Sequence, residues 1–375
     1  MITKPESPIW CQKPFVEINT DGVHAKPCCL YQRTSLILIE NYSKNKEIRD
    51  VRQQILDGQA PIQCKACTDN EKLSGKSLRT QSNNFDAFDT DLSYYTVDND
   101  IVLNLLVMSS NVCNLRCIHC SPDASYARGV EMYKLKLIDQ KPKLVESDLW
   151  HLKQIKFQKI TITGGEPFYD KRIISFLQEL PFSRDTSQIE IDINTNLTHV
   201  TSDLLLFFVS HYKKLQIKAS IDGFRESNDY LRYPSQWKDI EAAIDVIKSI
   251  PEIELCVTSS ISNLSLIHLP YLIEWTVAKG IRNHYFSMVN KPAELDPRKL
   301  SKNIRHSLLP KFAGVKNAID RDYHDRTVEL IDGCINLCEL ESSEDNSLLV
   351  DYLRKHDEER NTNFALVWPE LITEA

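Results

Sequence analysis

The chain has 375 residues, of which 45 are basic and 52 acidic, so its formal net charge is −7. This acidic balance gives no overall basic footprint, and we expect no nucleic-acid partner. No run of eighteen apolar residues predicts a transmembrane helix, and the first ten residues lack the apolar stretch of a signal peptide. We therefore expect a cytoplasmic protein without membrane contact, whose eleven cysteines bind metal rather than form disulfides.

The first part of the chain is rich in cysteine and polar turns, and no run in it predicts a hydrophobic helix. A short strand after Cys11 leads into a hairpin turn at Asp21 and Gly22, and the return strand ends before Cys28. This hairpin brings Cys11 close to Cys28. A structural zinc ion and a second iron–sulfur cluster both fit such a region. Its cysteines are Cys11, Cys28, Cys29, Cys64 and Cys67.

Six strand-length segments follow, separated by segments of helix length. The first, 101–108, is a continuous apolar run rich in branched residues, which is typical of a strand buried on both faces of a parallel sheet. The alternation predicts an α/β fold, a (β/α)6 partial TIM barrel with right-handed crossovers. The other strands are expected at 159–163, 188–196, 215–223, 253–263 and 284–289, and the helices at 147–157, 170–180, 201–212, 235–249 and 266–279.

The length exceeds the usual size of a single core, so more than one module is expected. After the barrel, apolar spacing predicts helices over about 299–320 and 322–340. The charged stretch 351–360 is expected to form a solvated helix face. The expected segments are a small cysteine-rich amino-terminal module at 1–95, the partial barrel at 96–291, and a helical carboxyl-terminal extension at 292–375.

Three cysteines lie within eight residues directly after the first barrel strand: Cys113, Cys117 and Cys120. Iron–sulfur clusters are usually held by four cysteine thiolates, so a compact loop of three indicates a four-iron cluster with one open iron. Active sites of barrel folds lie in the loops after the strands, where this loop is placed. The other interpretation is a zinc site in which His119 completes a set of three cysteines and one histidine.

A second motif follows one strand–helix unit later. The strand at 159–163 runs into Gly164, Gly165, Glu166 and Pro167, and paired glycines let backbone approach a ligand closely. Together, the Cys-x3-Cys-x2-Cys loop and this Gly-Gly-Glu-Pro segment closely resemble the signature of the radical S-adenosylmethionine (radical SAM) superfamily. The resemblance implies a partial TIM barrel and an enzyme whose open iron is chelated by the amino and carboxylate groups of SAM.

Further SAM contacts are implied by the same resemblance. The segment with Gly164, Gly165 and Glu166 would bind the SAM amino group. Polar residues at later strand ends would contact its sugar and methionine parts; these are Asn196, Ser220 and Asp222. His119 occupies a position where the family usually carries an aromatic residue that packs on the adenine, and histidine is a departure that can still stack.

The amino-terminal cysteines resemble a module called SPASM, or its shortened form, twitch, which carries an auxiliary cluster in many radical SAM enzymes. Here it precedes the barrel, as in a subgroup of twitch-domain proteins. Five residues lie between Gly22 and Cys28 where four are common, and we choose Cys28 over Cys29 as the ligand. With four cysteines the auxiliary cluster would be closed. The resemblance implies a group of the [4Fe-4S] type, and its ligands would be Cys11, Cys28, Cys64 and Cys67.

The activity implied is reductive cleavage of SAM at the [4Fe-4S] cluster, giving a 5′-deoxyadenosyl radical that abstracts hydrogen from a substrate. The resemblance implies a peptide or another natural product as substrate and a reductant such as flavodoxin or ferredoxin. A carbohydrate or nucleoside radical epimerase is the near alternative, and a non-catalytic zinc or iron–sulfur protein is an alternative of another class. An epimerase needs a hydrogen donor, and Cys334 and Cys338 are candidates for it. The alternative is that both cysteines have only a structural role.

Overall fold

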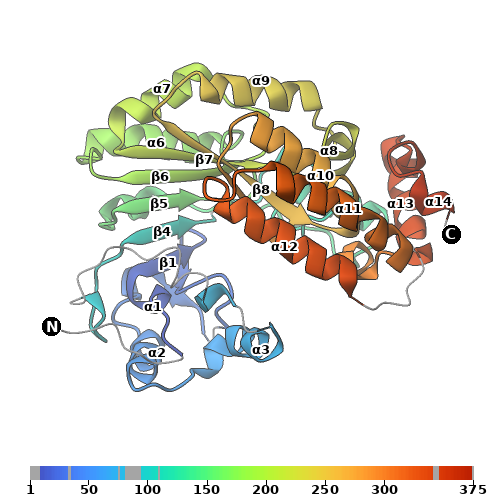
Figure 1. Cartoon of the computed structure of the whole chain (residues 1–375). Coiled ribbons are helices and arrows are strands. Elements are labelled where there is room, and N and C mark those ends of the chain that lie inside the picture. The colour runs from blue at the N-terminus through green and yellow to red at the C-terminus, as the bar shows by residue number, and fades with distance from the viewer. Residues whose placement is uncertain are drawn as a thin grey trace.

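The computed structural model describes residues 9–32, 35–74, 77–80, 94–108, 110–340 and 346–373. In this part of the chain, a sheet of nine strands has the order β3-β2-β1-β4-β5-β6-β7-β8-β9. Neighbours from β4 to β9 are parallel, and β1 is parallel to β4. The fold is therefore α/β with a mixed, mostly parallel sheet, consistent with a partial TIM barrel (Figure 1).

The six predicted barrel strands all form, within a few residues of their expected ends. Branched side chains in these strands are fully buried; Ile160, Ile191 and Ile217 are each 0% exposed. Branched side chains pack well on a pleated surface covered by helices, which explains why these segments become strands. The strands are β4 (Asn104–Val107), β5 (Lys159–Ile162), β6 (Glu190–Thr195), β7 (Lys214–Ser220), β8 (Ile253–Ile261) and β9 (Asn283–Met288).

The amino-terminal hairpin forms as predicted, but it is part of the barrel sheet. The helix α1 (Lys13–Val16) leads into β1 (Glu17–Thr20), which pairs antiparallel with β2 (His24–Lys26), and β3 (Ile37–Leu38) follows. In the turn, the Asp21 carboxylate accepts hydrogen bonds from the backbone N–H groups of Val23 and His24 at 2.9 and 2.7 Å. Because β1 also pairs with β4, the amino-terminal segment extends the sheet.

Two helices in the amino-terminal segment were not predicted. They are α2 (Lys46–Leu56) and α3 (Lys65–Ser74). Helix α2 is amphipathic rather than continuously apolar, and Ile48, Val51 and Ile55 form its buried face. Their spacing of three and four residues is the helical period, so the signal was present in the sequence.

Helices cover the outer face of the barrel strands. Of the five predicted there, the segment 147–157 forms only the short 3-10 helix η4 (Trp150–Gln154). Two short helices were not predicted, α5 (Tyr126–Lys134) after the cysteine loop and α8 (Glu226–Leu231). The remaining four are α6 (Lys171–Ser183), α7 (Ser202–His211), α9 (Trp237–Lys248) and α10 (Asn263–Ala278).

The carboxyl-terminal segment is helical, as predicted. Its helices α11 (Lys302–Ala318) and α12 (Asp325–Glu339) pack together, and α12 also packs against β9. They are followed by α13 (Ser347–Arg360) and α14 (Glu370–Thr373), which lie together at the right of Figure 1. Among the described residues, no helix is both long and apolar enough to span a membrane.

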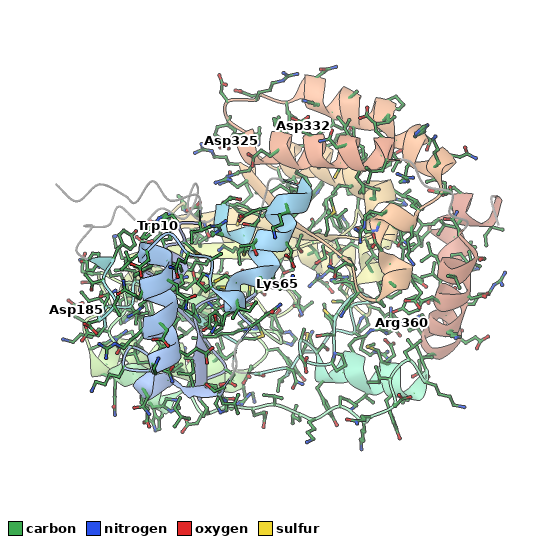
Figure 2. The ribbon with its side chains drawn as sticks, turned by 90° about the horizontal axis from the view of Figure 1, so that it is seen from below. Trp10, Lys65, Asp185, Asp325, Asp332 and Arg360 are labelled. Carbon is green, nitrogen blue, oxygen red and sulfur yellow. The ribbon has the colours of Figure 1, made fainter. Side chains whose placement is uncertain are left out.

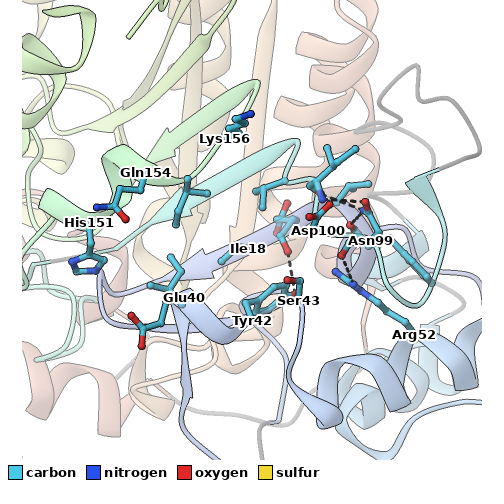
Figure 3. Close-up of a pocket in the computed structure, with 17 residues that line it drawn as sticks. Ile18, Glu40, Tyr42, Ser43, Arg52, Asn99, Asp100, His151, Gln154 and Lys156 are labelled. Atoms are coloured by element: carbon cyan, nitrogen blue, oxygen red, sulfur yellow. Dashed lines mark hydrogen bonds between the residues drawn. The ribbon is translucent and has the colours of Figure 1, made fainter. Parts of the chain in front are cut away.

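A buried arginine fastens α2 to the start of the sheet. Arg52 is 2% exposed and donates from Nε to the carbonyl of Pro14 at 2.8 Å. Its Nη1 donates to the carbonyls of Val97 and Asn99 at 3.0 and 2.6 Å. Figure 3 shows Arg52 beside Asn99, at one end of a groove that continues along β1. One side chain thus joins three separate stretches of backbone.

We expect Arg52→Met to lower the free energy of unfolding by about 3 kcal/mol, because three buried carbonyls lose their charged donor. Urea denaturation measures this change. The matched control is Arg49→Met on the same helix, whose exposed ion pair with Asp98 is expected to contribute less than about 1 kcal/mol. Equal destabilisation by the two substitutions would contradict the role given to Arg52.

Candidate functional site

The loops at the carboxyl ends of β4 to β7 bring the predicted site residues together. In a parallel sheet these ends all lie at one edge. The strands β4 and β5 pair Val107 with Ile162, so the loop with the three cysteines and the segment 164–167 leave the sheet side by side. We call residues 110–120 the cluster loop. Asn196 follows β6, and Asp222 lies just beyond β7.

The three cysteines of the cluster loop have buried or partly buried thiols that influence one another. Cys117 is 3% exposed, and Cys113 and Cys120 are intermediate. A hydrogen bond from the Cys120 thiol lowers the pKa of Cys117 to about 6. Burial raises the pKa of Cys113 to about 12. Because the thiolate is the metal-binding form, bound metal would have to displace the protons of the other two thiols.

The donor set fits a cluster better than a single ion. In the described ranges, no three His, Cys, Asp or Glu side chains are arranged to hold one metal ion. Three thiols on one loop suit three corners of a four-iron cube. Among the described residues, His119 is not grouped with these cysteines around a single ion, and its Nε2 lies 3.5 Å from a carboxylate oxygen of Asp222.

The two glycines after β5 lie against the cluster loop. Both have positive φ, 84° for Gly164 and 56° for Gly165. A Cβ on Gly165 would come within 2.3 Å of the Val112 carbonyl oxygen, and one on Gly164 within 2.4 Å of Met108 Cγ. Other residue types would be strained and would clash here. The glycines therefore allow the protein to pack closely on itself, at the place where the sequence predicts ligand contact.

Glu166 is buried and ties the segment after β5 to the end of β6. Its Oε1 accepts from the Thr195 hydroxyl at 2.7 Å, and its Oε2 accepts from the Asn196 N–H at 2.6 Å. Its own N–H donates to the Val112 carbonyl at 2.8 Å. Burial raises the pKa of the Glu166 carboxyl to about 7. The side chain thus fixes two loops, and its carboxylate already has protein donors.

Asn196 is the strand-end residue that reaches the cysteines. It is 3% exposed. Its Nδ2 lies 3.9 Å from Cys113 Sγ and donates to Asn114 Oδ1 at 3.0 Å. The other predicted contact at this level, Ser220, is the last residue of β7 and is partly buried. Both therefore stand on the same edge of the sheet as the cluster loop.

Asp222 makes its hydrogen bonds within the protein. It accepts from the Ser260 N–H at 2.7 Å and from Arg232 Nη1 at 2.6 Å, and it lies beside His119. Although burial opposes its charge, Arg232 and His119 lower the pKa of this carboxyl. The His119 Nδ1 atom is buried and has no hydrogen-bond partner in the part of the chain that the structure describes. Asp222 is thus placed to orient the His119 ring.

The four cysteines predicted for the auxiliary site line one pocket: Cys11, Cys28, Cys64 and Cys67. Cys29 is exposed and does not line it. Burial is the main reason why the pKa values of Cys11, Cys28 and Cys64 are raised to about 12, and neighbouring thiols add to the effect. Figure 2 marks Trp10 and Lys65, the chain neighbours of Cys11 and Cys64.

Cys334 and Cys338 both lie on α12, one helical turn apart, as their spacing predicts. Both are 0% exposed in the hydrophobic core. Burial raises the pKa of the Cys338 thiol to about 12, and it also raises the pKa of Cys334. Their surroundings match those of packed, protonated thiols.

Two residues of the site were missed in the sequence. Thr195 carries the hydroxyl that binds Glu166, and Arg232 binds Asp222. Thr195 precedes a predicted contact, so its strand-end position was a signal. Arg232 follows the unpredicted helix α8, and its partner Asp222 is ten residues earlier. No local pattern distinguishes it from a surface arginine.

Comparisons with known proteins agree with this site. The sequence pattern described as the radical SAM superfamily matches residues 107–267. An uncharacterized protein of Methanocaldococcus jannaschii is 26% identical over 216 residues, 55% of this chain and 68% of that protein. A GTP 3',8-cyclase of Desulforamulus reducens is 24% identical over 145 residues, 38% of this chain and 42% of the cyclase.

Among solved structures, Streptococcus suis SuiB bound to the precursor peptide SuiA has a TM-score of 0.39 at 12% identity. That comparison covers 74% of this chain and 60% of SuiB. The cluster loop and the segment 164–167 both lie inside the residues that match the superfamily pattern. With three thiols on one loop and the paired glycines against it, the chain is a radical SAM enzyme.

Proposed function

We propose that this radical SAM enzyme carries a second, closed iron–sulfur cluster at its amino-terminal cysteines and modifies a peptide or another natural product. The observation that carries the proposal is the convergence of Cys11, Cys28, Cys64 and Cys67 on one pocket, with Cys29 outside it. Four thiols leave no open coordination position in such a cluster. This favours a structural or electron-transfer role over direct binding of substrate.

At the barrel, Cys113, Cys117 and Cys120 would hold the cluster that binds SAM. Bound together, a [4Fe-4S] cluster and SAM supply reductive cleavage of the sulfonium and the carbon radical that takes hydrogen from the substrate. The chain binds, orients and encloses these groups. Asn196 Nδ2 stands beside one ligand sulfur, and His119 offers a buried nitrogen. Gly164, Gly165, Ser220 and the backbone around Glu166 line the same edge and are proposed SAM contacts.

The substrate class rests on the resemblance of the cysteine pattern to twitch and SPASM enzymes. A carbohydrate or nucleoside epimerase remains the alternative, and the likeness to GTP 3',8-cyclases adds a nucleotide to that class. A protein such as flavodoxin or ferredoxin is the proposed reductant. The hydrogen-donor role of Cys334 and Cys338 stays a prediction, and their complete burial supports the structural alternative.

Replacing Cys113, Cys117 and Cys120 together with Ala should remove one cluster's iron and abolish 5′-deoxyadenosine formation from SAM under dithionite, because no thiolate remains to hold that cluster. Iron analysis and chromatography of the products measure both effects. The matched control, Cys256→Ala, removes a thiol that is buried in β8 away from either group. If the triple variant forms as much 5′-deoxyadenosine as the unchanged chain, the assignment of these ligands is wrong.

Replacing Cys64 and Cys67 with Ala should halve the iron content of reconstituted protein from about eight atoms per chain. The barrel cluster should still bind SAM, because its three ligands come from another loop. Anaerobic reconstitution with iron and zinc analysis makes the measurement, and Cys29→Ala is the control expected to keep full iron. Stoichiometric zinc at this site, with only one cluster in the chain, would overturn the auxiliary-cluster proposal.

Adding GTP to the assay tests the proposed substrate class. If the enzyme modifies a peptide, 5′-deoxyadenosine should form at the same rate with and without GTP, and mass spectrometry should find the GTP unchanged. Dithionite-reduced enzyme with SAM is sufficient for this assay. A GTP-dependent rise in 5′-deoxyadenosine with a new nucleotide product would replace the peptide proposal by the nucleotide alternative.

A further inference from the structure

The charged carboxyl-terminal helix α13 is not a solvated surface helix. Its residues Tyr352, His356 and Arg360 are spaced by four, so they share one helix face. That face is buried, with exposed fractions of 4%, 0% and 4%. The expectation that 351–360 forms a solvated face is therefore wrong for these residues, although Arg354 and Lys355 are exposed.

The buried face of α13 meets a carboxylate on α5, and Figure 2 shows Arg360 at the end of α13 that faces this helix. Arg360 donates from Nε and Nη2 to the two oxygens of Glu131, at 2.8 and 2.7 Å. Arg128 pairs with the same carboxylate. Burial opposes the charge of Glu131, but its hydrogen bonds with Arg360 and the charges of both arginines lower its pKa to about 2.

His356 completes this network as a neutral ring. Its Nε2 lies 2.8 Å from Arg128 Nη1, and its Nδ1 lies 2.7 Å from the Tyr352 carbonyl. An arginine only donates and a carbonyl only accepts, so Nε2 is the acceptor and Nδ1 carries the proton. Burial lowers the pKa of His356 to about 3, in agreement with the neutral form.

The network ends on the backbone of the cluster loop, on both sides of Cys117. Arg360 Nη2 donates to the carbonyl of Arg116 at 2.5 Å. Arg128 Nη2 donates to the carbonyl of Ile118 at 2.9 Å, and the Tyr352 hydroxyl lies 3.3 Å from the same oxygen. Two carbonyls that flank a cluster ligand are therefore held by side chains from α5 and α13.

The opposite edge of the same short stretch is held by backbone. The N–H of Arg116 donates to the Tyr233 carbonyl at 2.7 Å, and the N–H of Ile118 donates to the Leu231 carbonyl at 2.8 Å. Both polar groups of each flanking residue thus have a partner inside the protein. Cys117 is held between two fixed peptide units. Helix α13 contributes Arg360 and Tyr352 on the carbonyl side, and the other contacts come from the barrel segment.

From these contacts we infer that α13 is a clamp on the cluster loop, with Tyr352, His356 and Arg360 as positioning residues for Cys117. The clamp fixes the position of the Cys117 thiolate and does not itself contact SAM or substrate. It is independent of the auxiliary cluster and of the substrate class. Its loss should therefore loosen the cluster loop while the rest of the barrel stays folded.

Hydrogen exchange of the full, cluster-loaded chain tests this inference at the amides of Arg116 and Ile118. In Arg360→Lys and in Tyr352→Phe, we expect these amides to exchange at least tenfold faster, since each substitution removes a donor to the loop. We also expect faster release of iron to a chelator and an altered electron paramagnetic resonance signal of the reduced cluster. The matched control is Arg354→Lys on the exposed face of α13, which should behave as the unchanged chain.

Amides of α7 serve as the reference for general unfolding, because this helix packs against α6, α9 and β7 and lies on the opposite side of Figure 1 from α13. Tyr352→Phe removes a single hydroxyl and carries the test if Arg360→Lys does not fold. Wild-type exchange at Arg116 and Ile118 in a folded variant would overturn the inference. So would an equal rise at α7, because the effect would then be loss of stability throughout the chain.

Discussion

The close contact between the segment after β5 and the cluster loop is the constraint on which the site depends. The Gly165 backbone approaches the Val112 carbonyl so closely that no Cβ fits between them. The Glu166 N–H then donates to that carbonyl, and its carboxylate reaches across to β6. Three neighbouring loops are thereby fixed by glycine, a buried carboxylate and one backbone hydrogen bond. The motif that resembles a ligand-binding signature is also what holds the loops of this site together.

Electrostatics imposes a second constraint on the same loop, because three thiolates on one short stretch repel each other. Arg232 is buried beside them and binds Asp222 at 2.6 Å. Although burial opposes its charge, the Cys117 thiolate and Asp222 raise the pKa of Arg232. A permanent guanidinium is suited to this place, since it keeps its charge in a dry site where lysine loses it readily. Before any metal arrives, the cation stabilises the thiolate of Cys117, the one of the three thiols whose pKa is lowered.

The barrel was predictable because its signals are local. Apolar runs such as 159–163 end in glycine or polar residues, and the strands form there. The cysteine spacing likewise needs no knowledge of distant residues. The pairing of β1 with β4 was not predictable in this way, because about eighty residues separate the two strands and neither one specifies its partner. The prediction of a helix over 147–157 was wrong for another reason. The helical pattern is present, but Leu152 is the buried residue of η4, and a short 3-10 helix is enough to bury it.

Helix α13 shows that a charged stretch of sequence does not reveal whether its side chains are solvated or buried. An arginine and a glutamate that pair across a buried interface look the same in the sequence as two solvated residues. Arg360 and Glu131 are 229 positions apart, so no helical spacing links them. The cysteine motif predicts the cluster ligands from a stretch of only eight residues. How firmly the loop is held depends on the last fifth of the chain, and this dependence can be read only from the folded structure.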